Sequence, residues 1–211
     1  DYVIENYFHL PEYWEVDGGK YFSLYELSTF VKGLGGMQQA AEAIESFRKK
    51  AAAKGYKLHI NFVEWGLQNE ALTGSDKNKA VEICKGDSVT SYVWIHNFVP
   101  KAPLYAPYAD WRDGAVPYWE KFRNTFSVEY YPNVSMGWDS SGRFDPQEEY
   151  VADPNGGYYC TIMSENTPEE FEKALQMSKD FLDAGKNRNK IVTLYAWNEW
   201  TEGGYLEPEK K

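Results

Sequence analysis

Cysteine and histidine are both scarce in this sequence of 211 residues, which contains two cysteines and three histidines. Cys84 and Cys160 lie far apart along the chain, and neither a C-x-x-C motif nor a cluster of histidines occurs. A disulfide scaffold or a structural zinc site is therefore not expected. We predict two free thiols in packed positions, no metal site and no cofactor.

Long apolar runs and a basic leader segment are also missing. No window approaches the roughly 18 consecutive apolar residues of a membrane-spanning helix. The opening DYVIENYFHL has neither a basic n-region nor an apolar h-region, so no signal peptide is visible. We expect no membrane insertion, and the sequence leaves the compartment open.

The chain lacks an excess of positive charge. Its 32 acidic residues outnumber its 22 Lys and Arg residues, which gives a formal net charge of −10. Such a charge repels phosphate backbones and anionic lipids, so a nucleic-acid partner or a membrane-surface role is not expected. A neutral or cationic partner suits this charge better.

Strands and helices are predicted to alternate along the chain. Apolar β-branched runs predict strands at residues 21–25, 57–63, 90–95, 132–137 and 190–197. Helical spacing predicts helices at residues 37–54, 77–85, near 115–125, and from Asn166 or Thr167 to Gly185. This alternation indicates an α/β fold with a parallel sheet.

The number of predicted strands suggests part of a (β/α)8 barrel of the TIM type. A complete barrel has eight strand–helix units and about 250 residues, whereas five strands are predicted here. We therefore expect residues 1–211 to be a single barrel domain that holds the C-terminal five or so strands, a fragment lacking the first three. Unclosed sheet edges in such a fragment pair readily with another chain, so we expect the isolated piece either to belong to a longer protein or to self-associate through those edges.

Aromatic residues are abundant: 8 Trp, 17 Tyr and 11 Phe make up 17% of the chain. Most are expected in the core, but rings just beyond strand ends lie where pockets form, and flat rings suit the faces of pyranose sugars. Five predicted strand ends bring polar or aromatic side chains to one rim, which predicts a carbohydrate-binding cleft. The predicted substrate-binding residues are Tyr25, Glu64, Trp65, His96, Trp138, Asp139, Arg143, Trp197, Asn198, Trp200 and Tyr205. Two alternatives stay open: a purely structural role for His96, and an ion pair between Arg143 and Asp139.

Two carboxylates follow the last predicted strand within the stretch NEWTEGG. Only two residues separate Glu199 from Glu202, so one turn can bring both side chains together, and Gly203 and Gly204 let the backbone bend away. Neighbouring carboxylates push their pKa values apart, which supplies the acid and the base that glycoside hydrolysis needs. We predict that Glu199 and Glu202 are catalytic; the alternative is two solvated loop residues that never meet.

The stretch from Trp197 to Pro208, WNEWTEGGYLEP, resembles the N-E-W-x-E-G signature of the endo-α-mannosidase family of glycoside hydrolases, family 99. It is closer still to the WbsX-like proteins of polysaccharide gene clusters, which are often labelled glycosyltransferases. YFHLPEYWEVDGGKYFSLY, VSMGWDSSGR and NTPEEFEKAL resemble further segments of these relatives, in the same order. The likeness covers most of the chain.

The resemblance implies roles for the two acids. The residue matching Glu199 acts as a base on the substrate's 2-hydroxyl, which attacks the anomeric carbon and gives a 1,2-anhydro sugar, with overall retention. The residue matching Glu202 is the acid for the leaving group and later the base for water. The relatives have His where this chain has Thr201, so mannose specificity is not carried over. The resemblance implies no metal.

Three functions are compatible with these features. The first is a retaining glycoside hydrolase acting on a polysaccharide or glycan. The second is a WbsX-type glycosyltransferase or accessory enzyme of surface-polysaccharide biosynthesis, although the sequence shows neither a Gly-rich diphosphate-binding turn nor a metal-binding D-x-D motif. The third is a non-catalytic carbohydrate-binding protein that uses the acids only as hydrogen-bond acceptors.

Overall fold

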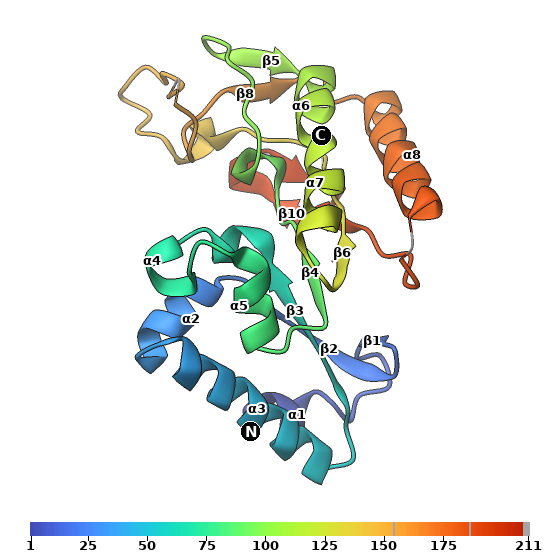
Figure 1. The fold of residues 1–211 in the computed structure, drawn as a ribbon. Helices are drawn as coiled ribbons and strands as arrows, with labels where there is room; N and C mark the ends of the chain where they lie inside the picture. The colour runs from blue at the N-terminus through green and yellow to red at the C-terminus, as the bar shows by residue number, and fades with distance from the viewer. Residues whose placement is uncertain (154, 186, 209–211) are drawn as a thin grey trace. The chain divides into compact units, whose positions relative to one another are not determined.

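The computed structural model describes residues 1–153, 155–185 and 187–208. Contacts within the chain group it into two units. The first unit contains Asp1–Thr90 and Arg123–Tyr130, and the second contains Ser91–Phe122 and the residues from Tyr131 onwards. Figure 1 shows the elements of both units in chain order, and each unit is described by itself.

The first unit is built on a sheet with a parallel centre. Its strands are β1 (Glu15–Val16), β2 (Gly19–Leu24), β3 (Leu58–Val63), β4 (Ser88–Thr90) and β6 (Glu129–Tyr131), in the order β1-β2-β3-β4-β6. Strand β3 pairs in parallel with β2 and with β4, in registers that set Leu24 beside Phe62 and Val63 beside Thr90. All six residues of β3 are buried, as expected for the centre of a parallel sheet.

The helices of this unit connect the parallel strands. They are α1 (Tyr2–Asn6), α2 (Leu27–Leu34), α3 (Met37–Ala53), α4 (Glu70–Thr73) and α5 (Lys77–Ile83), with a 3₁₀ turn, η1 (Glu64–Leu67), after β3. Helix α3 buries Ala40, Ile44 and Ala51 along one stripe and is followed by Gly55 in the left-handed region, at φ 83°.

The second unit contains three separate strand pairs. Strands β5 (Tyr105–Pro107) and β8 (Ile162–Ser164) are parallel, as are β7 (Asn133–Ser135) and β9 (Thr193–Tyr195), while β10 (Asn198–Glu199) and β11 (Gly204–Tyr205) form an antiparallel hairpin. Three short 3₁₀ turns lie at or just after the ends of predicted strand regions, and they are η2 (Trp94–His96), η3 (Ser140–Arg143) and η4 (Trp200–Glu202).

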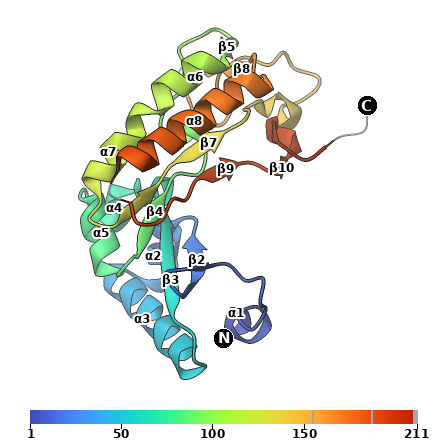
Figure 2. The same ribbon diagram turned by 90° about the vertical axis from the view of Figure 1, so that its right-hand side faces the viewer.

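Helices α6 (Tyr108–Ala115), α7 (Pro117–Thr125) and α8 (Pro168–Ala184) complete the described elements. Helix α6 lies beside α8, and α8 packs on β7 (Figure 2). The start of α8 follows from its sequence, because Thr167 caps the helix by accepting a hydrogen bond from the Glu170 amide and Pro168 occupies the first turn. Among the residues that the structure describes, no helix combines the length and apolar character needed to span a bilayer.

Most of the predicted elements are confirmed, with one strand misplaced. The predicted strand at residues 90–95 is wrong, because β4 ends at Thr90 and Trp94 begins a 3₁₀ turn. The Trp94 amide donates to Ser135 Oγ and its indole N–H donates to the Asn133 carbonyl, so side-chain hydrogen bonds replace a strand ladder here. The sequence did not predict α2, α6 or the β5–β8 pair. That the whole chain forms a single barrel domain remains a prediction.

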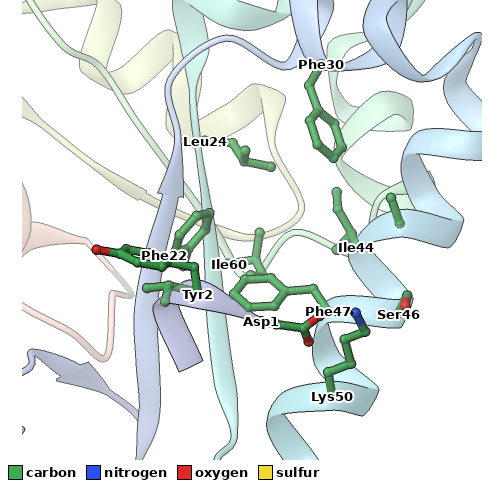
Figure 3. A pocket seen from close by; sticks show the side chains of 12 residues that line it. Asp1, Tyr2, Phe22, Leu24, Phe30, Ile44, Ser46, Phe47, Lys50 and Ile60 are labelled. Atoms are coloured by element: carbon green, nitrogen blue, oxygen red, sulfur yellow. Dashed lines mark hydrogen bonds and ion pairs between the residues drawn. The ribbon is translucent and has the colours of Figure 1, made fainter. Parts of the chain in front are cut away.

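A hollow of about 490 Å³ lies in the first unit (Figure 3). Its walls are mainly apolar and come from β2, β3, α2 and α3, with Phe22, Phe30 and Phe47 among the lining residues. An ion pair of 2.8 Å between Lys50 and Asp1 stands at this hollow. None of the predicted site residues lines it, so it does not correspond to the predicted cleft.

Both cysteines are free and buried, which confirms the prediction for them. Burial raises the pKa of the Cys84 thiol to about 11 and that of Cys160 to about 12. Because the thiolate is the reactive form, we expect neither thiol to react appreciably with iodoacetamide at about pH 8 in the folded protein, and both to react after denaturation. Mass spectrometry of alkylated protein measures this. The prediction would be contradicted if either thiol of the native protein were labelled as fast as free glutathione.

Candidate active site

A short hairpin presents the two predicted acids. Strands β10 and β11 pair Asn198 with Tyr205 and Glu199 with Gly204, and η4 closes the turn between them. Gly203 lies in the left-handed region at φ 63°, the conformation that favours glycine. The hairpin therefore sets Glu199 at the end of a strand and Glu202 at the end of the turn.

Two glycines let neighbouring segments approach this hairpin closely. A Cβ on Gly204 would stand 2.3 Å from Cε1 of Tyr195, and one on Gly203 would stand 2.8 Å from Cβ of Asp139. The Asp139 amide also donates a 2.7 Å hydrogen bond to the Glu202 carbonyl, joining η3 to η4. Gly204, unlike Gly203, is not in the left-handed region, so its role is to permit close packing against Tyr195.

Glu202 is buried, with 9% of its surface exposed, and both its carboxylate oxygens accept hydrogen bonds. The Tyr158 hydroxyl donates to Oε1 over 2.9 Å, and the Tyr195 hydroxyl donates to Oε2. Nη1 of Arg143 forms an ion pair with Oε1 at 2.9 Å. A buried carboxylate with such partners is held in one position.

Arg143 connects both acids. Its Nη2 lies 3.5 Å from Oε2 of Glu199, while its Nη1 contacts Glu202. Its Nε donates a 2.7 Å hydrogen bond to Oγ1 of Thr201, and its Cζ lies 5.7 Å from the centre of the Tyr158 ring. One guanidinium therefore spans the two carboxylates, and the alternative in which the glutamates never meet is wrong.

The ion pair considered between Arg143 and Asp139 is also wrong. Asp139 caps η3 instead, where its Oδ1 accepts a 2.9 Å hydrogen bond from the Ser141 amide. The side chain is thereby turned to its own backbone, as short acidic residues at turn starts commonly are. Arg143, at the other end of η3, points to the hairpin.

The two phenols at Glu202 resist deprotonation. Burial raises the pKa of Tyr158 to about 12, and the hydrogen bond to Glu202 acts in the same direction. Burial, with the same carboxylate, also raises the pKa of Tyr195. Both phenols are therefore protonated near neutral pH and act as donors to Glu202.

The raised pKa of Tyr158 predicts a loss of stability in alkali. The folded state holds the phenolic proton more tightly than the unfolded state, whose phenol has a pKa of about 10. This stabilisation is complete below pH 10 and is lost as the pH rises through about 12. We expect Tyr158→Phe to lose less unfolding free energy than wild type between about pH 10 and 12 in urea titrations. An equal loss in both proteins would contradict the assignment.

Aromatic residues near the hairpin fall into buried and exposed groups. Trp138 is buried, with its ring 5.4 Å from that of Tyr158 and 6.0 Å from that of Tyr195, so it packs against the two phenols. Trp197 is 61% exposed, and Asn198 is exposed beside it. Trp200 stacks on Tyr205 with ring centres 4.0 Å apart.

His96 lies on η2 and is half-buried. Its ring stacks on that of Tyr92 at 6.1 Å, and Tyr92 packs edge-on against Tyr195. Burial lowers the pKa of His96 to about 4, so the imidazole is neutral near pH 7. This environment favours the structural role that the sequence left open for His96.

The remaining predicted site residues form a cluster in the first unit. The rings of Tyr25 and Trp65 lie 5.3 Å apart, after β2 and β3. Glu64 is 1% exposed, and its Oε1 pairs with Nζ of Lys77 at 2.5 Å. A Cβ on Gly66 would stand 2.6 Å from the Tyr25 carbonyl oxygen, so this glycine permits the close approach of η1 to the end of β2.

Tyr158 and Tyr195 were not predicted as site residues. Tyr195 is the last residue of β9, and nothing in the apolar run of that strand marks it as a donor to Glu202. Tyr158 lies in the loop between η3 and β8, in a stretch rich in glycine and tyrosine, without a strand end to mark it. Among the described residues, no group of three or more His, Cys, Asp and Glu side chains could hold a metal ion.

The fold is α/β of the (β/α)8-barrel type, present in part, and the described site pairs two acids through one arginine. The chain belongs to the family described as glycosyltransferase WbsX, whose family model matches residues 2–211. None of the curated proteins compared with the chain matches it.

Two solved structures of a GH99 endo-α-mannosidase from Bacteroides thetaiotaomicron share the fold. One has a TM-score of 0.56 at 14% identity and matches 98% of this chain and 50% of its own length. The other, a complex with bis-tris propane, has a TM-score of 0.53 at 14% identity and matches 98% of this chain and 52% of its own. The chain thus spans about half the length of these structures, which is consistent with the expectation of a partial barrel.

Proposed function

We propose that the protein hydrolyses glycosidic bonds in a polysaccharide or glycan, with retention of configuration, through Glu199 and Glu202. The bridging of both carboxylates by Arg143 carries this proposal, because it holds the half-buried Glu199 and the buried Glu202 beside one guanidinium. The shared fold with a GH99 endo-α-mannosidase supports the same class of reaction. The neutral character of most glycans also suits a chain with a net charge of −10.

The two acids have different surroundings, which supports two different roles. The Glu202 side chain is 12% exposed and has three donors, whereas the Glu199 side chain is 35% exposed and contacts Arg143 at the longer distance of 3.5 Å. Carboxyl groups in unlike environments are the usual arrangement for an acid and a base in glycosidases. The more open Glu199 can reach a substrate hydroxyl.

In the proposed first step, Glu199 takes the proton of the 2-hydroxyl as that oxygen attacks the anomeric carbon. The bond from the anomeric carbon to the leaving oxygen breaks, and Glu202, which enters this step protonated, gives that oxygen its proton. In the second step, Glu202 takes a proton from water, which adds to the anomeric carbon and opens the 1,2-anhydro ring, while Glu199 returns its proton to the 2-oxygen. Two inversions at the anomeric carbon give net retention.

The proposal is tested on the full-length protein with a panel of surface polysaccharides and with an α-mannan. We expect new reducing ends, and proton NMR of the first product should show the anomer present in the substrate. A first product of opposite configuration would contradict the retaining route. No cleavage across the panel, together with binding of a glycan, would favour a non-catalytic carbohydrate-binding protein.

The family description favours a second candidate, a glycosyltransferase or accessory enzyme of surface-polysaccharide biosynthesis. Such an enzyme would bind a nucleotide-sugar donor. Isothermal titration calorimetry with UDP- and GDP-sugars distinguishes the candidates, because the hydrolase is expected to show no binding. Micromolar binding of a donor sugar without glycan hydrolysis would support the transferase.

A further inference from the structure

A second hollow lies next to the acid-bearing hairpin, within the second unit. It has a volume of about 470 Å³, inside the range of roughly 300–1,000 Å³ typical of small-molecule sites. Its walls come from the segment between β7 and η3, the η4 turn with β11, and the segments around β8 and the start of α8. Neither Glu199 nor Glu202 lines it, so it is separate from the paired carboxylates.

An aromatic pair forms one wall of this hollow. Trp200 and Tyr205 stack at 4.0 Å with an angle of 24° between their planes. The indole N–H of Trp200 donates a 3.1 Å hydrogen bond to Oε2 of Glu207, which fixes the orientation of the ring. Trp200 nevertheless remains 39% exposed, so part of its surface is available to a ligand.

Polar groups face the hollow from the other walls. Oδ1 of Asp139 accepts a hydrogen bond from the Ser141 amide, whereas Oδ2 accepts none from the described residues. The Asn166 side-chain amide donates to the Met136 carbonyl over 3.1 Å, which anchors it with its own carbonyl oxygen unused among described residues. Asp139 is the one charged side chain among the lining residues.

We propose that this hollow binds a neutral hexopyranose unit of a glycan. A flat apolar ring packs on the face of a pyranose, and a carboxylate accepts charge-assisted hydrogen bonds from sugar hydroxyls. The single negative charge disfavours uronic and sialic acids, since an anion would face Asp139 without a cation among the lining residues. The site rests on the proposed function and deepens it, because Asp139, Trp200 and Tyr205 are among the residues predicted from the sequence to bind the substrate. It would hold one sugar unit of the glycan beside the paired acids.

The test is an NMR titration that follows the tryptophan indole N–H signals, with the Trp200 signal assigned by its loss in Trp200→Phe. The probes are methyl α-D-mannopyranoside, methyl β-D-glucopyranoside and methyl β-D-galactopyranoside. We expect at least one probe to shift the Trp200 signal saturably, with millimolar affinity. Ser141→Phe, which places a ring in the hollow, is expected to weaken this binding at least tenfold, whereas Ser141→Ala should change it by less than about threefold.

Each outcome decides for or against the site. The proposal is overturned if no probe shifts the Trp200 signal, or if binding persists at full strength in Ser141→Phe. Should Ser141→Phe fail to fold, Asn166→Phe places a ring in the hollow from another lining position and is judged by the same criterion. The signals report binding whether or not the protein cleaves a glycan, so failure of the hollow and failure of the proposed hydrolysis are observed separately.

Discussion

Changing Glu202 to glutamine is expected to lower kcat for glycan hydrolysis by about 10²–10⁴-fold. The amide cannot give a proton to the leaving oxygen or take one from water. It also presents an N–H group where Glu202 now accepts hydrogen bonds from Tyr158, Tyr195 and Arg143, so one of these donors loses its acceptor. Initial rates on the cleaved glycan measure the effect, and circular dichroism confirms that the variant is folded.

Substrates with different leaving groups distinguish the roles of the two acids. An activated aryl glycoside needs little protonation as it departs, so Glu202→Gln should still release a burst of phenolate from such a substrate. Glu199→Gln should not, because its amide cannot take the proton from the 2-hydroxyl. We expect Glu199→Gln to lose activity by a similar factor of about 10²–10⁴ on both kinds of substrate.

Glu172→Gln provides the matched control for both variants. Glu172 is exposed on α8, in the same unit as the hairpin, and the substitution makes the same chemical change. Its activity should equal that of wild type. If Glu199→Gln and Glu202→Gln were as active as Glu172→Gln, the assignment of the paired acids would be wrong.

Local sequence patterns were enough to predict the ends of several strands and helices. The apolar run at residues 57–63 predicts β3, and the strand is buried throughout. The cap at Thr167 with Pro168 predicts the start of α8 correctly. The spacing of Glu199 and Glu202, followed by two glycines, likewise predicts a tight turn, because a turn depends on residues that are adjacent in sequence.

Contacts between distant segments were not predictable in the same way. The sequence left open an ion pair of Arg143 with Asp139, four residues away, whereas the guanidinium contacts a hairpin more than fifty residues later. Tyr158 reaches Glu202 across 44 residues. Trp138, predicted at a rim, is buried against Tyr158 and Tyr195 because the segments after β7 and β9 pack together. These pairings arise from tertiary packing, which leaves no periodicity in the sequence.

Removing the charge of Arg143 is expected to reduce hydrolysis by about 10²-fold, since a displacement of about 1 Å at reacting groups has an effect of this size. In Arg143→Met the two carboxylates lose the cation between them and repel each other, so their side chains separate. Arg143→Lys keeps the charge but offers a compact ammonium in place of a planar fork. It should therefore recover only part of the activity. Measurement of kcat and KM for the three proteins tests this.

Substitutions of Thr201 test whether hydrolysis depends on the position of the Arg143 guanidinium as well as on its charge. The Thr201 hydroxyl accepts the Nε hydrogen bond of Arg143 over 2.7 Å and so fixes the plane of the guanidinium. Thr201→Val removes this acceptor but keeps the shape of the side chain, and we expect kcat to fall about tenfold, the effect of losing one hydrogen bond to a charged group. Thr201→Ser keeps the hydroxyl and should stay near wild-type activity.

A structural role for Thr201 would give a different pattern. If only packing of its methyl group mattered, Thr201→Ser would be the weaker enzyme and Thr201→Val would be normal, because valine keeps the branched shape. The double variant Arg143→Met with Thr201→Val adds a second test: it should be no slower than Arg143→Met alone, since the hydroxyl acts through the guanidinium. Additive losses in the double variant would show that Thr201 acts independently of Arg143.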